Sequence, residues 1–383
     1  MAATLSFPWR NHNAFKLLID SDRFFPEMLN AIDHSESFIF LEQYLIKSGR
    51  VLDLFLDSLI SAAQRGVKIY ILFDDYGAKG VASKDLQKLA TDNIYLAHYN
   101  PFRWSQLYKS MRRNHRKLLL IDGNIAFVGG ACISDEYQFK QANTMSWHDI
   151  VLKIRGDAVH DWYLSFANIW TSINQQPLIP LKKIIHNEFS QHGRVVLAQG
   201  PGRNQVIRSA IKRIKKSQQR VWIATPYFLT TRKLRHALKK TSKRGVDVRL
   251  LLPGAISDHP WISQAARRYY ARLLRNGVKI FEYQPRFIHA KLILCDDWVS
   301  VGSSNLDRWN QFWNLDANQT VNDPALLQQA SNMFETDFAA SSQVTYDSWK
   351  KRPLLQRLSE WWSSYIVRLI QWVVFFSARI KKE

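Results

Sequence analysis

The second half of this 383-residue chain repeats the sequence pattern of its first half. Residues 65–73, RGVKIYILF, match residues 244–252, RGVDVRLLL. Residues 114–137, NHRKLLLIDGNIAFVGGACISDEY, match residues 288–309, IHAKLILCDDWVSVGSSNLDRW. The second pair of matching segments contains His115 and His289. These histidines are 289 − 115 = 174 residues apart, which is close to half the chain. An internal duplication of this kind requires the two halves to adopt the same fold.

Each half alternates between strand and helix patterns. In the first half, strands are expected at 38–41, 67–73, 118–121 and 125–128, with helices at 51–65 and 158–170. The second half repeats the order, with strands at 221–224, 246–252, 292–294 and 299–301 and helices at 234–244 and 325–338. The pattern predicts a duplicated α/β sandwich, with two pseudo-symmetric halves sharing one active site. The expected boundaries are a first half at 1–174, a linker at 175–193, a second half at 194–340 and an amphipathic segment at 341–383.

Composition excludes several classes of protein. Hydrophobic residues make up 46% of the chain, too many for a disordered protein. Two cysteines, Cys132 and Cys295, cannot form a disulfide framework, and we interpret both as buried small hydrophobic residues. Lysine and arginine outnumber acidic residues by 53 to 32. The net charge of +21 therefore indicates a polyanionic partner: nucleic acid, an anionic membrane or a phosphate-containing substrate.

Each half contains a histidine and a lysine two residues apart, followed by an aspartate at the same spacing. Residues two apart in a strand project from the same face, so each histidine and its lysine should point together. Small-residue turns follow at 129–130 and 302–305, where backbone amides and short side chains can approach a phosphate. Two equivalent copies favour catalysis over ordinary polar surface. The candidate catalytic residues are His115, Lys117, Asp122, His289, Lys291 and Asp296.

Two histidines and two lysines can perform phosphodiester transfer. One imidazole attacks phosphorus and forms a phospho-histidine, while the other protonates the leaving alkoxide and then deprotonates the incoming hydroxyl. The lysines supply the fixed positive charge that a metal ion would otherwise provide. We therefore expect no cofactor and no metal, and the sequence has no Cys/His cluster with zinc spacing.

The paired motifs resemble those of the phospholipase D superfamily. Within it, the segments FLEQYLI, WHDIVLKIRGDAV and TPYFL are similar to the bacterial cardiolipin synthases, and the resemblance extends from about residue 15 to 338. It implies that His115 is the nucleophile and His289 the acid and base. Asp122 and Asp296 would hold the loop behind each strand. The remaining implied residues bind the phosphate (Lys117, Lys291, Ser303, Asn305 and Gly130) or orient the histidines (Asp149 and Asp316). Cys132 departs from the pattern, because the second half has Asn305 at this position.

Two segments favour a lipid surface over nucleic acid. Residues 101–114 mix aromatic and basic side chains, which suits a membrane headgroup region, although such a mixture also stacks on bases. Residues 361–380 have a broad apolar face with a narrow polar stripe, as in a helix that lies in the interface. The alternative is a helix packed on the protein itself. We expect an anionic phospholipid membrane and phospholipid substrates as partners, and no nucleic acid. The expected location is peripheral, on the cytoplasmic face of a bacterial inner membrane; the oligomeric state stays open.

The resemblance implies cardiolipin synthesis, in which one phosphatidylglycerol gives its phosphatidyl group to the hydroxyl of another. Three alternatives remain at this point. Water as acceptor would make the protein a phospholipase D, a different substrate would make it a nucleic-acid phosphodiesterase, and loss of activity would leave a lipid-binding scaffold.

Overall fold

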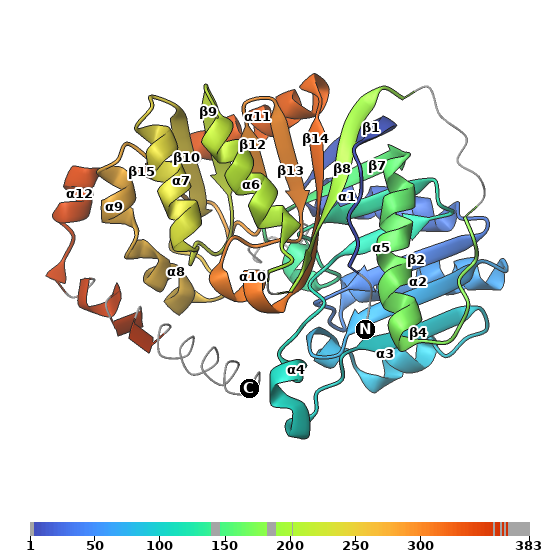
Figure 1. The fold of residues 1–383 in the computed structure, drawn as a ribbon. Coiled ribbons are helices and arrows are strands. Elements are labelled where there is room, and N and C mark those ends of the chain that lie inside the picture. Colours follow the sequence, from blue (N-terminus) through green and yellow to red (C-terminus); the bar gives the residue numbers. More distant parts are fainter. Residues whose placement is uncertain are drawn as a thin grey trace.

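The computed structural model describes residues 4–138, 146–181, 189–200, 202–354, 357–360, 362–363 and 365–366. The described part forms a single fifteen-stranded sheet that runs through both halves, with helices on its two faces (Figure 1). Short 3-10 turns occur at Gly77–Lys79, Trp104–Gln106 and Asp135–Tyr137.

The two halves of the sheet have the same strand order. From the centre outward, the first half contains β1 (Arg10–Ile19), β7 (Ile150–Gly156), β6 (Ile125–Gly129), β5 (Leu118–Ile121), β2 (Phe38–Gln43), β3 (Lys68–Asp74) and β4 (Ile94–Tyr99). The second half contains β8 (Gln191–Gln199), β14 (Leu315–Asn322), β13 (Trp298–Gly302), β12 (Leu292–Cys295), β9 (Arg220–Ala224), β10 (Asp247–Pro253) and β11 (Lys279–Tyr283). The predicted duplicated α/β fold is confirmed, and β1 and β8, which the sequence patterns did not indicate, pair to join the halves.

Helices occupy equivalent positions in the two halves. On one face lie α5 (Ala158–Ile173) and α11 (Pro324–Ala339), whose apolar residues share one hydrophobic cluster with strands of both halves. The opposite face carries α1 (Ser21–Asp33), α2 (Arg50–Gln64) and the short α3 (Ser83–Lys88) in the first half. In the second half it carries α6 (Gln205–Lys216), α7 (Arg232–Ser242), α8 (Pro260–Arg267) and α9 (Tyr270–Leu274). Because both faces are covered, strands such as β2 (FIFLEQ) are buried along their whole length.

The second half continues beyond the boundary expected at residue 340. There β15 (Ser341–Val344) pairs antiparallel with β11, and α12 (Tyr346–Lys350) buries Trp349 in the hydrophobic cluster of the second half. No helix among the described residues is long and apolar enough to cross a membrane. Most of the segment 361–380, for which an interfacial helix was expected, lies outside the described residues.

Asp122 and Asp296 each hold a turn at the end of a motif strand. The carboxylate of Asp122 accepts three backbone hydrogen bonds, of 2.7 to 2.9 Å, from Glu36, Ser37 and Phe38. Asp296 accepts three equivalent bonds, of 2.8 to 3.0 Å, from residues 218–220. Five strand positions at about 3.3 Å each place Asp122 about 16 Å from the backbone of Lys117. Both aspartates therefore stabilise the scaffold rather than contact the reacting groups.

We expect Asp122→Ala to lower the free energy of unfolding by about 2–4 kcal/mol, because hydrogen bonds to a charged acceptor are lost. Alanine must also adopt the positive backbone angle of Asp122 (φ 52°), which an aspartate or asparagine tolerates better. Urea unfolding measures the change. Asp122→Asn, which keeps an acceptor oxygen, is the control and should cost clearly less. Equal stability of the alanine variant and the unsubstituted protein would contradict this account.

Candidate active site

The two motif segments are held in place by the opposite half of the molecule. Just before β5, the backbone N–H of His115 donates to Leu315 O (2.9 Å), and Leu315 N–H donates back to Arg113 O (2.9 Å). Just before β12, His289 N–H donates to His148 O (2.7 Å). Each histidine is thus fixed by the segment at the start of a strand of the other half, β14 or β7. The pseudo-symmetry of the sheet brings the two motifs together.

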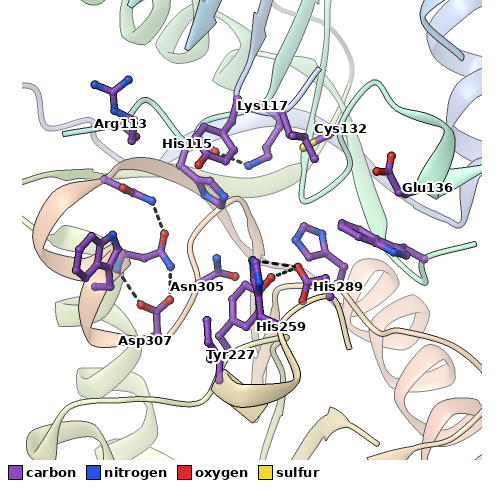
Figure 2. A pocket seen from close by; sticks show the side chains of 18 of the residues that line it. Arg113, His115, Lys117, Cys132, Glu136, Tyr227, His259, His289, Asn305 and Asp307 are labelled. Carbon is purple, nitrogen blue, oxygen red and sulfur yellow. Dashed lines mark hydrogen bonds and ion pairs between the residues drawn. The ribbon is translucent and has the colours of Figure 1, made fainter. Parts of the chain in front are cut away.

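A cavity of about 710 Å³ lies where the motifs meet. Figure 2 shows the side chains of His115, Lys117, His289 and Asn305 around this cavity. Lys291 is buried directly behind, with its Nζ atom 2.9 Å from Nε2 of His289. The structure therefore places both predicted histidines and both predicted lysines in one site. Part of the wall is apolar or aromatic: Leu45, Trp147, Leu229, Trp261 and Ile262.

Each histidine is hydrogen-bonded to an aspartate from the other half. Nδ1 of His115 lies 2.9 Å from Oδ1 of Asp316, which is the second residue of β14. Nδ1 of His289 lies 2.6 Å from Oδ2 of Asp149, just before β7. An Nδ1–H bond to a carboxylate fixes the imidazole tautomer and leaves Nε2 with its lone pair. The pairing is crossed, so neither half contains a complete histidine–aspartate pair.

Burial controls the ionisation of the site. Burial, opposed by the carboxylates and reinforced by the neighbouring lysines, lowers the pKa of His115 and of His289 to about 4. Burial lowers the pKa of Lys117 and brings that of Lys291 to about 8. The pKa of Asp149 is lowered, because Lys291 and His289 outweigh the opposing effect of its burial. At neutral pH both imidazoles are therefore neutral beside a protonated Lys291, and a neutral imidazole is the state needed by a nucleophile that must attack a phosphate.

The three predicted phosphate-binding residues of the turns have different positions. Asn305 lines the cavity, and its Oδ1 atom is buried without a hydrogen-bond partner among the described residues. Ser303 instead donates its hydroxyl to Oδ1 of Asp316 (2.8 Å). Gly130, at the equivalent position, packs against the carboxylate of Asp149, which a Cβ atom would overlap. In this structure Ser303 and Gly130 position the aspartates, and Asn305 faces the substrate space.

Several residues of the cavity were not assigned a role from the sequence. Tyr137 places its hydroxyl 3.0 Å from Nδ1 of His289, and the ring of Tyr44 packs edge-on against His115 and under Lys117. Tyr227 donates to Asp258 at the cavity wall. Burial raises the pKa of Asp307, also in the wall, to about 6. Tyr44 and Tyr227 belong to FLEQYLI and TPYFL, so the signal was a tyrosine just after the buried strands β2 and β9.

No group of three or more His, Cys, Asp or Glu side chains that could hold a metal ion occurs in the part of the chain that the structure describes. Lys47, Arg113 and Lys117 line the cavity, and Lys291 lies behind His289. Cys132, also in the cavity wall, is buried, as is Cys295.

Residues 28–170 and 210–338 match the protein family described as "Cardiolipin synthase, PLD-like domain". The chain belongs to the phospholipase D superfamily. A cardiolipin synthase of Clostridium perfringens (strain SM101) is 32% identical over 94% of this chain and 77% of that protein. Cardiolipin synthase 1 of Bacillus cereus is 29% identical over 92% of this chain and 72% of its own length. The family predicted from the sequence is confirmed, and the protein is a cardiolipin synthase-like phosphatidyltransferase of this superfamily.

Solved structures share the fold. Phosphatidylserine synthase from Haemophilus influenzae superposes with a TM-score of 0.74 at 13% identity, over 96% of each chain. A polyphosphate kinase from Porphyromonas gingivalis gives a TM-score of 0.61 at 15% identity, over 87% of this chain and 49% of that chain. At these identities the likeness establishes the fold, and the site must be interpreted from its own residues.

We expect kcat/KM to have a bell-shaped pH profile, because it reports ionisations of the free enzyme. The acid limb should lie near pH 4, where the imidazoles become protonated and the nucleophile is lost. The alkaline limb should lie near pH 8, where Lys291 loses the charge that attracts the phosphate.

Lys291→Arg tests the alkaline limb, because guanidinium stays protonated to above about pH 12. The limb should move upward in the variant even if the maximal rate falls. An unchanged alkaline limb would exclude Lys291 as its source.

Proposed function

We propose that this protein transfers a phosphatidyl group between phospholipids through a phospho-histidine, and that it makes cardiolipin from two phosphatidylglycerol molecules. His115 Nε2 forms a bond to phosphorus while the bond from phosphorus to the glycerol headgroup oxygen breaks, and His289 gives a proton to that oxygen. The same imidazole then removes the proton of the incoming hydroxyl. That oxygen bonds to phosphorus as the bond to His115 breaks, so two displacements retain the configuration at phosphorus.

One observation carries the assignment of roles. Nε2 of His115 faces the cavity and has no hydrogen-bond partner among the described residues, whereas Nζ of Lys291 lies 2.9 Å from both Nδ1 and Nε2 of His289. A nucleophile needs a free lone pair, and an acid and base needs a proton source close by. An entering phosphate monoanion favours the protonated form of His289, because a nearby negative charge raises the pKa of an imidazole.

The remaining groups stabilise the transition state. Lys117 and Lys291, both buried, supply positive charge where the phosphoryl oxygens gain negative charge. The amide of Asn305 adds a hydrogen bond from the second-half turn. Cys132 holds the equivalent position in the first half and provides only a weak donor. The phosphate is therefore bound more strongly by the second-half turn.

The walls of the cavity support a lipid rather than a nucleic acid as substrate. Leucine, isoleucine and tryptophan side chains line it next to the histidines, and these match a glycerol backbone and the start of acyl chains. Water as acceptor would give a phospholipase D by the same first step. The products distinguish the two reactions.

The test combines product analysis with trapping. Incubation with phosphatidylglycerol vesicles should yield cardiolipin and glycerol by mass spectrometry, whereas phosphatidic acid as the main product would indicate the hydrolase. His115→Ala and His289→Ala should each lower turnover at least about 100-fold, as expected for loss of a nucleophile or a general acid.

Peptide mapping of the trapped intermediate should place the phosphatidyl group on the peptide that contains His115. Its recovery on the His289 peptide would reverse the roles, and cleavage of single-stranded DNA at a comparable rate would overturn the lipid assignment.

We also propose that the cavity opens toward an anionic membrane surface, which the enzyme contacts peripherally, on the cytoplasmic side of a bacterial inner membrane. Ser359 and Ser363 hydrogen-bond at 2.9 Å each to Gln264 of α8, the helix whose Trp261 and Ile262 line the cavity. Here exposed apolar residues form what we call the apolar rim: Trp261, Leu354, Leu358, Trp362 and Ile366, which are 45% to 71% exposed. Trp104, beside α4 (Leu107–Ser110), is 84% exposed. Large exposed apolar groups beside a lipid-sized cavity favour contact with a bilayer.

Leu358→Ser combined with Ile366→Ser should weaken flotation with phosphatidylglycerol vesicles about 10- to 100-fold, because each buried aliphatic side chain contributes about 1.5 kcal/mol or more. Substitution is preferable to truncation, because Glu360 is buried and paired with Arg352 at 3.1 Å.

Leu54→Ser combined with Leu164→Ser is the matched control, since these leucines are 46% and 37% exposed on α2 and α5. Activity on a short-chain, soluble phosphatidylglycerol should not change in either double variant. Equal loss of flotation in both would show that the apolar rim has no special role.

A further inference from the structure

A second cavity, of about 940 Å³, lies beside the catalytic cavity and shares Leu229 with it. We call it the basic cavity. It is bounded by α6, the start of α7, the end of α8 and the start of α10 (Arg308–Trp313). None of the described residues that line it is acidic, and six are cationic: Arg208, Arg232, Lys233, Arg235, Arg268 and Arg308. A charge run on a helix is usually a solvated face, but here cations from several elements converge on one hollow.

The floor of the basic cavity is apolar. Ile207, Leu229 and Ala265 are buried there, and Ile211 and Phe312 are partly buried beside them. An apolar floor below a cationic rim matches a molecule that carries a phosphate on an apolar body. A polyanion without such a body would leave this floor unused.

A buried hydroxyl points to a missing ligand. Thr230 is 2% exposed and lines the basic cavity, and its Oγ1 atom has no hydrogen-bond partner among the described residues. Leaving a buried hydroxyl without a partner destabilises a folded protein, so such groups are normally satisfied. A phosphate oxygen in the cavity would accept a hydrogen bond from it.

Arg235 is held next to this hydroxyl. Its guanidinium donates to the backbone O of Thr230 and stacks over the ring of Tyr269, 3.9 Å from the centroid. Burial lowers the pKa of Arg235, and repulsion from Arg272 and Arg232 adds to this effect. Cations that repel one another in a half-buried site gain stability when an anion enters.

We propose that the basic cavity binds the phosphate of a second anionic phospholipid, through Arg235, Thr230 and the surrounding cations, with the lipid's glycerol and acyl part on the apolar floor. This site goes beyond the proposed reaction, because it is separate from the histidines and needs no turnover. Its place beside the catalytic cavity would keep one lipid next to the one that reacts. Inorganic phosphate carries the same anionic group as the lipid headgroup, so the test must distinguish binding of a phospholipid from binding of free phosphate.

The test uses the full chain with His115→Ala, so that turnover cannot consume the ligand. Calorimetric titration with dihexanoyl phosphatidylglycerol, below its micelle concentration, should give two molecules bound per chain. Arg232→Glu combined with Lys233→Glu should reduce this to one, with about tenfold or greater loss of affinity at the lost site, because each cation near a lipid phosphate contributes substantially.

Lys215→Glu combined with Lys216→Glu changes the net charge equally on exposed residues of α6 outside the cavity, and it should keep both sites. Thr230→Val should weaken the second site without loss of stability, because its hydroxyl has no hydrogen-bond partner among the described residues to lose. Equal loss of lipid binding in the two charge-reversed variants would show that binding depends on the net charge of the protein and not on the basic cavity. That result would overturn the proposal.

Inorganic phosphate and a single-stranded oligonucleotide are the competing probes. Neither should displace the lipid from the second site at equal concentration. Full displacement by phosphate would identify a free-phosphate site, and tighter binding of the oligonucleotide would identify a nucleic-acid site; either overturns the lipid assignment. Because binding is measured without activity, this inference can fail while the proposed reaction stands, and the reverse also holds.

Discussion

The catalytic arrangement depends on two hydrogen bonds that cross between the halves, from His115 to Asp316 and from His289 to Asp149. A hydrogen bond between histidine and aspartate requires the two atoms to lie within about 3 Å, so the two halves must be held in one fixed relative position. The structure achieves this with the central β1–β8 pair, with a hydrophobic cluster that spans both halves, and with backbone hydrogen bonds from the motif segments to the opposite half. Neither half contains a complete histidine–aspartate pair of its own.

The crossed histidine–aspartate pairs also bring buried groups of opposite charge together. Two buried lysines would be costly without compensation, and two buried aspartates equally so. Grouping all four around two neutral imidazoles places each lysine near an aspartate, and a bound phosphate would add negative charge beside the lysines. Burial disfavours the charged form of both lysines, and the pKa values of Lys117 and Lys291 are lowered for this reason.

Two features of the second half, the apolar rim and the basic cavity, lie beside the catalytic cavity. Trp261 of the apolar rim belongs to α8 and lines the catalytic cavity together with Ile262, and Ser359 hydrogen-bonds to Gln264 of the same helix. The end of α8 also borders the basic cavity. A phosphatidyltransferase that joins two lipids must bring both from a bilayer without releasing them into water. The proposed second lipid site, the histidines and the proposed membrane contact form one continuous path that would meet this need.

The duplication alone determined the fold class and the six motif residues, because two copies of a strand–turn pattern leave few alternatives. It also indicated Asp149 and Asp316 through the resemblance, but which histidine each aspartate contacts depends on how the halves dock, and sequence spacing within one half carries no information on that. Gly130 and Ser303 occupy equivalent turns, one in each half. How far each turn lies from the substrate space depends on tertiary packing, and the structure places both residues beside the aspartates instead of in that space. The basic cavity is formed by side chains that lie up to 100 residues apart, from Arg208 to Arg308, and only the tertiary structure brings them to one cavity.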